Sequence, residues 1–214
     1  MGRLFALLAL IALAPAHLAI AALIWLDDRG PVFHLAHRAG RGGRSFVMFK
    51  YRSMRTASAP LIDAGFKTVV EPGDARVTRA GRILRCGLDE LPQLINIVRG
   101  EMAWIGPRPD EPWMLPYYGP AIRERLSTAP GVTGLAQVCD SRRLPTPLVY
   151  ALEIWGVRRR STSLTLRILA ITPLFVLGRR SIGRNLLGRL LADPEVAGLE
   201  KECRRELEPA RAIS

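Results

Sequence analysis

The chain has 214 residues, and its 31 Lys and Arg against 19 Asp and Glu give a formal net charge of +12. This charge excludes a neutral surface, while 49% hydrophobic and only 23% charged residues exclude a disordered chain. All but three of the cations are arginines, whose planar guanidinium suits phosphate. The composition therefore indicates three classes of partner: nucleic acid, lipid headgroups or a phosphorylated substrate.

The first predicted element is a membrane segment. Residues 4–26 are apolar except for His17 and are interrupted by Pro15. A spanning helix needs about 20 apolar residues, so the length suffices. Pro15 divides the run into halves that each rise only about 16 Å as helix, so a helix-break-helix that enters and leaves on one face fits as well as a span. Arginines on both sides of the run favour two cytoplasmic ends.

A secretory signal is the rival interpretation of the same residues. Arg3 would be a minimal positive region, and 14–16 a small-residue cleavage site. The apolar run continues well past that site, which argues against cleavage.

A strand is predicted next, because residues 46–54 alternate in hydrophobicity. This period places Lys50 and Arg52 on one face, about 7 Å apart, where they can hold two phosphates. Solvent-facing cations on an edge strand are the alternative.

The following stretch, 56–74, reads as an irregular loop. A short basic amphipathic helix is then predicted over 76–85, with arginines at every third position from Arg76 to Arg85. These arginines form a solvated face, a lipid-facing surface or part of an active-site wall.

Two adjacent carboxylates, Asp89 and Glu90, precede an apolar helical pattern that ends before Gly100. Because proline is tolerated only in the first turn, Pro92 places the helix start at the carboxylates. Free N–H groups and the positive end of the helix dipole there keep a carboxylate ionised and attract phosphate. The alternative is structural: an N-cap aspartate and an ordinary first-turn charge.

Arg108 lies between two prolines in the sequence Gly106-Pro107-Arg108-Pro109. The prolines restrict the main chain to a stiff, extended form. A guanidinium held in this way loses little entropy when it binds phosphate. The alternative is a proline-rich turn with Arg108 on the surface.

Two further segments lie toward the carboxyl end. Residues 164–177 are apolar but too short to span a bilayer, and they suit either an interfacial helix or a buried core helix. Residues 193–214 mix both charges and predict a solvent-exposed helical tail with a frayed end.

Several motifs follow one another in a fixed order: RGPVF, FKYRSM, LDELPQL, IGPRP and PGVTGLAQV. In this order they resemble the bacterial sugar transferase family, the monotopic polyprenyl-phosphate phosphoglycosyl transferases. The resemblance implies an α+β, mainly helical fold of the small single-domain type. It also implies transfer of a phosphosugar from a UDP-sugar to polyprenyl phosphate, which releases UMP and starts glycan assembly.

The resemblance also implies roles for individual residues. Asp89 would be the nucleophile that forms an aspartyl phosphosugar, with Glu90 as its partner, and both would hold Mg²⁺ (or Mn²⁺). The phosphate-binding positions fall on Lys50, Arg52, Arg85 and Arg108, and the membrane-helix break falls on Pro15.

Three parts are expected: a re-entrant helix at 1–28, a catalytic domain at 29–192 and an exposed tail at 193–214. The resemblance places the enzyme on the cytoplasmic face of the bacterial inner membrane, against anionic lipid, with homo-oligomers possible. Nucleic acid is not expected as a partner, since few aromatic residues for base stacking accompany the arginines. The competing hypothesis is a membrane-anchored module that binds polyanions or anionic lipid without catalysis.

Overall fold

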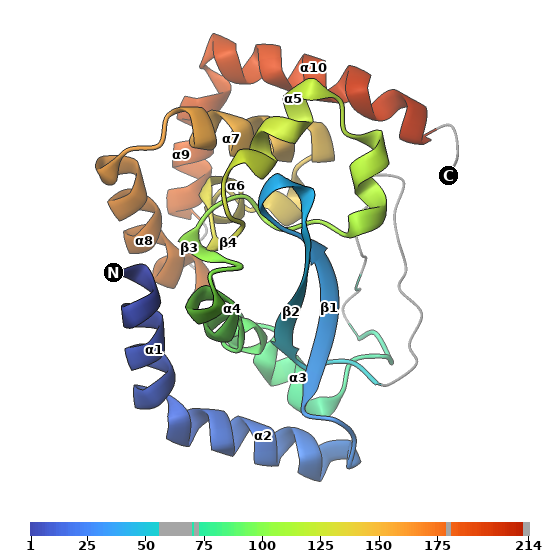
Figure 1. Ribbon diagram of the computed structural model, residues 1–214, viewed down its shortest axis with the longest axis vertical. Helices are drawn as coiled ribbons and strands as arrows, with labels where there is room; N and C mark the ends of the chain where they lie inside the picture. Colours follow the sequence, from blue (N-terminus) through green and yellow to red (C-terminus); the bar gives the residue numbers. More distant parts are fainter. Residues whose placement is uncertain (56–69, 71–72, 179–180, 212–214) are drawn as a thin grey trace.

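The computed structural model describes residues 1–55, 70, 73–178 and 181–211. Over these ranges the chain is mainly helical with two small sheets (Figure 1), which confirms the α+β expectation. Most of the loop predicted at 56–74 lies outside the described residues, as do Arg179 and Arg180.

The amino-terminal segment forms two helices, α1 (Gly2–Ala12) and α2 (Ala14–Asp28), which meet at an angle of 61°. Pro15 lies in the first turn of α2, where the missing N–H costs no hydrogen bond, so the bend precedes it at Leu13. Among the described helices, none is long and apolar enough to cross a bilayer alone, whereas the bent pair α1–α2 reaches that length and apolarity together.

The strands β1 (Phe33–Ala39) and β2 (Ser45–Tyr51) form an antiparallel hairpin whose connection contains η1 (Arg41–Gly43). Phe46 and Met48 pack against Leu94 and Ile97 of α4 (Gln93–Arg99), the helix that lies beside β2 in Figure 1. Arg52 lies one residue beyond the end of β2, and its side chain binds Asp28 whereas that of Lys50 binds Glu90, so the prediction that the two cations project together is wrong. Beyond Tyr51 the Arg52 N–H still donates to the Val32 carbonyl, and the chain then meets residues 76–78 through a single bridge and adjacent hydrogen bonds.

The basic helix is shorter than predicted. Helix α3 covers Arg79–Leu84 and begins at Thr78, whose hydroxyl accepts the Gly81 N–H. A Cβ on Gly81 would stand 2.0 Å from the Ser53 carbonyl oxygen. The glycine that weakens the helical pattern therefore allows α3 to lie directly against the chain that leaves β2.

A one-turn helix, η2 (Leu88–Glu90), leads into α4. Gly100 ends α4 in the left-handed conformation with φ 79°, as predicted for a glycine after a helix. The strand β3 (Ala103–Ile105) then pairs in parallel with β4 (Gly131–Thr133).

The main hydrophobic core is built around α7 (Thr146–Arg158), whose residues from Thr146 to Ile154 are buried. Shorter elements surround it: η3 (Pro112–Tyr117), α5 (Pro120–Arg123), η4 (Glu124–Ser127), α6 (Leu135–Val138), η5 (Ser141–Arg143) and α9 (Ser181–Leu191).

The expected exposed tail is instead α10 (Pro194–Arg211), which lies against α7 and α5 (Figure 1). Val196, Leu199, Cys203 and Leu207 bury one stripe of this helix in the main core. Its Glu206 carboxylate accepts the N–H groups of Ala121 and Ile122 and so caps α5. The predicted helix is confirmed, but the tail is not fully exposed, because this apolar stripe is covered.

Helix α8 (Thr162–Val176) buries Ile168 and packs Leu164 and Ile171 partly against the main core, whereas Leu166, Leu169 and Val176 are exposed. Leu166 and Leu169 are 60% and 40% exposed. Of the two predicted alternatives, the structure favours a surface helix over a core helix.

Candidate active site

The carboxylates of Asp89 and Glu90 lie on η2, directly before α4. Gly87 precedes the turn with φ 121°, a conformation that a residue with a Cβ rarely adopts. Glu90 Oε1 accepts Lys50 Nζ at 2.8 Å and Arg108 Nη2 at 3.3 Å. One carboxylate oxygen therefore joins three segments distant in sequence: β2, η2 and the loop after β3.

The pKa values of the two neighbouring carboxylates are shifted in opposite directions. Burial raises the pKa of Glu90, but Lys50 and Arg108 outweigh it and hold the pKa at about 2. Burial raises the pKa of Asp89, and Lys50 and Arg85 only partly oppose this. Within the described residues, no ion pair engages the Asp89 carboxylate. Glu90 is thus the anion that organises the cations, and Asp89 is the carboxylate left for reaction or for a metal ion.

The predicted cations fall into two groups. Lys50 and Arg108 contact Glu90, and Arg85 lies within electrostatic reach of Asp89 with its Nη1 3.4 Å from Ser53 Oγ. Arg52 points elsewhere: its guanidinium forms a two-pronged ion pair with Asp28 at the end of α2, and its Nε donates to the Pro31 carbonyl. The structure does not bring Arg52 into the cluster.

Asn96 aligns the strand and the helix that carry this cluster. Its buried amide donates to the Val47 carbonyl at 2.7 Å and accepts the Phe49 N–H at 3.0 Å. The side chain pairs with the free edge of β2 as a neighbouring strand would. It thereby fixes Lys50 on β2 relative to Glu90, which precedes α4.

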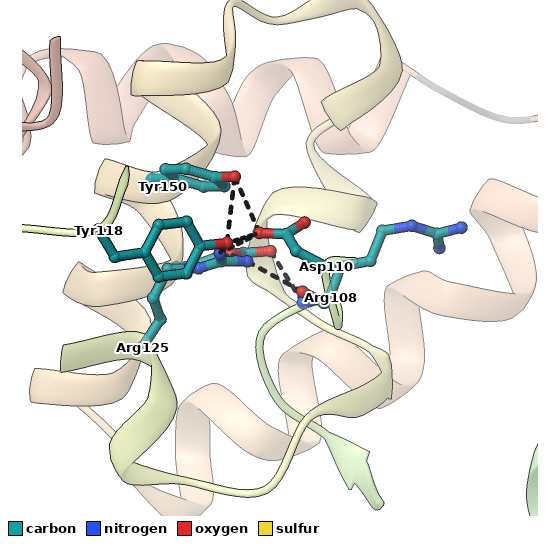
Figure 2. A network of polar contacts seen from close by, with 6 residues as sticks. Arg108, Asp110, Tyr118, Arg125 and Tyr150 are labelled. Atoms are coloured by element: carbon teal, nitrogen blue, oxygen red, sulfur yellow. Dashed lines mark hydrogen bonds and ion pairs between the residues drawn. The ribbon is translucent and has the colours of Figure 1, made fainter. Parts of the chain in front are cut away.

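A buried polar network supports the Arg108 loop (Figure 2). It links the side chains of Asp110, Tyr118, Arg125, Tyr150 and Glu153. Sequence reasoning missed these residues. The one available signal was Glu153, a carboxylate inside the apolar helical run of α7, because a buried charge requires a partner.

The residues at the site supply part of the ligand set of a hard divalent cation. Among the described residues, no group of three or more His, Cys, Asp or Glu side chains forms a complete set of ligands. Mg²⁺ commonly uses one or two carboxylates and completes its shell with water and substrate phosphates. Asp89, which has no ion-pair partner in the described chain, suits this arrangement better than Glu90, whose Oε1 already accepts two cations.

The sequence matches known proteins along most of its length. The profile of the bacterial sugar transferase family matches residues 1–179, so the chain belongs to this family. A UDP-glucose:undecaprenyl-phosphate glucose-1-phosphate transferase of Xanthomonas campestris pv. campestris is 37% identical over 193 residues, which is 84% of the chain. The undecaprenyl-phosphate glucose phosphotransferase of Komagataeibacter xylinus is 44% identical over 143 residues, or 63% of the chain.

A third relative is the exopolysaccharide production protein ExoY of Sinorhizobium fredii, 40% identical over 147 residues, again 63% of the chain. The match covers 38%, 26% and 65% of the lengths of these three relatives, in the order given. Asp89, Glu90 and Arg108 lie inside the region that the family profile matches.

Proposed function

We propose that this chain transfers a phosphosugar from a UDP-sugar to a polyprenyl phosphate, releases UMP and so starts the assembly of a glycan. Family membership and the names of the relatives support the reaction class. The observation that carries the proposal is the Asp89 carboxylate, which has no ion-pair partner in the described residues and stands beside a second carboxylate held by two cations.

The proposed chemistry has two displacements at phosphorus. An Asp89 carboxylate oxygen attacks the phosphorus that bears the sugar, and the bond to the bridging oxygen breaks, so that UMP leaves with the electron pair. An oxygen of the polyprenyl phosphate then attacks the aspartyl phosphosugar and releases the Asp89 carboxylate. The products are a polyprenyl diphosphate sugar and the original enzyme.

The cations neutralise the charge that accumulates during these displacements. Arg108 and Lys50 both contact Glu90 Oε1, next to Asp89 in the chain, where each can bind a phosphate oxygen. Arg85 lies within electrostatic reach of Asp89 and adds a third positive charge. Asp89, with Glu90 nearby, would hold Mg²⁺ or Mn²⁺, which supplies charge neutralisation for the diphosphate when bound.

The acceptor is a lipid, so the proposal includes a membrane surface. Helices α1 and α2 expose large apolar side chains, among them Phe5 at 63% and Leu18 at 73%. On α8, Leu166 and Val176 are likewise exposed. We place α1–α2 in the cytoplasmic leaflet of the bacterial inner membrane as a re-entrant pair, with α8 at the interface beside anionic headgroups.

A UMP-release assay tests the proposed reaction. Vesicles that contain undecaprenyl phosphate, Mg²⁺ and one UDP-sugar at a time would be given the wild-type protein or Asp89→Asn. We expect release with at least one donor and none with Asp89→Asn. Glu200→Gln, which changes a partly exposed carboxylate paired with Arg204, is the matched control and should retain full activity. UMP release that survives Asp89→Asn would exclude the proposed chemistry.

A further inference from the structure

The main chain at Arg108 is fixed by buried side chains on both of its polar groups. Its N–H donates to Glu153 Oε1 at 2.9 Å, and its carbonyl accepts Arg125 Nη2 at 2.9 Å. The Arg108 guanidinium points away from these partners, as Figure 2 shows, and reaches Glu90 instead. The buried contacts therefore hold the main chain of Arg108 and do not engage its guanidinium.

Arg125 is the centre of this network. Its Nε donates to Glu153 Oε2 at 2.7 Å, and its Nη1 donates to Tyr118 Oη at 3.0 Å and to the Asp110 carboxylate. The side chains of Arg125 and Glu153 are each 2% exposed. Every nitrogen of the guanidinium is engaged, a pattern that the single ammonium of lysine does not reproduce.

The second carboxylate of the network is equally constrained. Asp110 accepts the Tyr150 hydroxyl at 2.8 Å and the Tyr118 hydroxyl, and Arg125 holds its pKa low despite its burial. Tyr118 follows η3 and Tyr150 lies on α7, so the anchor points belong to the main core.

Stability alone is a weak reason for such a network. Replacing a buried ion network by apolar residues of similar volume is often neutral or stabilising, so the charges call for another role. Pro107 and Pro109 stiffen the loop itself but do not fix its place relative to the core. Side chains from η4 and α7 supply that connection at Arg108.

We propose that Arg125 is a positioning residue for phosphate binding. By holding the Arg108 carbonyl directly and the Arg108 N–H through Glu153, it sets where the Arg108 guanidinium meets the diphosphate of a nucleotide-sugar donor. Preorganisation of this kind lowers the entropy lost on binding. The inference rests on the proposed function, which assigns a phosphate to Arg108.

A double-mutant cycle on UDP binding tests this role. Calorimetry with UDP and Mg²⁺ would compare the wild-type protein, Arg125→Lys, Arg108→Met and the double variant. We expect Arg125→Lys to weaken UDP binding about tenfold when Arg108 is present and less than about twofold when it is methionine. Arg158→Lys, which alters an arginine paired with Glu124 on the surface, is the control and should bind UDP as the wild type does.

The possible outcomes distinguish the positioning role of Arg125 from the proposed function. An equal loss of UDP affinity in both backgrounds, or no loss from Arg125→Lys, would overturn the positioning role and leave the proposed function standing. A wild-type protein that binds no UDP would overturn both. Glu153→Gln preserves the shape of the side chain and removes its charge, so it should show the same dependence on Arg108. It replaces Arg125→Lys in the cycle if thermal unfolding shows that the lysine variant does not fold.

Discussion

Two arginines that look alike in the sequence have different surroundings in the fold. Arg52 follows β2, its side chain is only 6% exposed, and its two terminal nitrogens donate to the two carboxylate oxygens of Asp28 at the end of α2. Arg108 has a 48% exposed side chain that meets Glu90 through a single nitrogen, although its main chain is tightly held. A phosphate can reach the guanidinium of Arg108, whereas it would have to displace the Asp28 carboxylate to reach that of Arg52.

The difference shows that the position of the counter-ion decides what a cation does. The ion pair between Arg52 and Asp28 joins the amino-terminal helices to the rest of the chain. Asp27, the residue before Asp28, reinforces this junction because its carboxylate accepts the Ala80 N–H at the start of α3. The Arg52 region is therefore a structural joint, and the Arg108 region is the proposed phosphate site.

Replacing Arg108 should give the largest effect on activity. We expect Arg108→Met to lower kcat/KM by about 10²- to 10³-fold, since a preorganised charge is lost where negative charge develops. The same change should leave the melting temperature almost unchanged, because the guanidinium is half exposed. Steady-state UMP release and thermal unfolding would be measured on the same preparation. Full activity in this variant would place the phosphate elsewhere.

Replacing Lys50 should alter the pH dependence. Because Lys50 opposes the raised pKa of Asp89, Lys50→Met should raise that pKa further. The proposed nucleophile must be ionised, so the acidic limb of kcat/KM should move to higher pH than in the wild-type protein. An acidic limb that moves to lower pH, or stays in place, would contradict the coupling between Lys50 and Asp89.

Removing the ion pair between Arg52 and Asp28 should lower stability and leave activity unchanged, the opposite of the result expected for Arg108. We expect Asp28→Asn to lower the free energy of unfolding by about 1–3 kcal/mol, while UMP release per folded molecule stays near the wild-type value. Denaturant unfolding in detergent provides the measurement. A large loss of kcat/KM without a loss of stability would return Arg52 to the phosphate-binding set.

The stability difference should also depend on pH. Arg52 lowers the pKa of Asp28 in the folded protein, so the ion pair contributes fully above the unfolded pKa, near 3.8. Its contribution is lost as the pH falls through the folded value. The wild-type protein and Asp28→Asn should therefore converge in stability in strong acid, and a constant difference would exclude the ion pair as the cause.

The smallest effect is expected at an exposed ion pair. Arg158→Gln removes the contacts with Glu124, whose side chain is 40% exposed, and with Glu195, and should change stability by about 0–1 kcal/mol. Activity should be unaffected. A loss of stability comparable to that of Asp28→Asn would show that the exposure of an ion pair does not determine how much it contributes to stability.

Local sequence patterns predicted the segments of the site better than their partners. Pro92 and the apolar spacing located the carboxylates before α4, and the two prolines located the loop of Arg108. The partner of Arg52 could not be predicted, since Asp28 lies in another element and pairing depends on tertiary structure. For the same reason, Arg125 and Glu153 gave no local sign of meeting at the Arg108 main chain.

The carboxyl-terminal helix was misjudged for a different reason. Its apolar residues Val196, Leu199, Cys203 and Leu207 recur at helical spacing, but charged residues dominate the segment. Composition indicated exposure, whereas the narrow apolar stripe decides packing once α7 offers a surface.

Covalent capture at Asp89 is the most direct test of the proposed chemistry. Wild-type protein would be incubated with Mg²⁺ and the UDP-sugar identified by UMP release, without polyprenyl phosphate, and then subjected to intact-mass measurement and peptide mapping. We predict a mass gain of one phosphosugar on the peptide that contains Asp89, its loss on addition of undecaprenyl phosphate, and no gain in Asp89→Asn. Transfer that proceeds without such an adduct, or an adduct that persists in Asp89→Asn, would contradict the account.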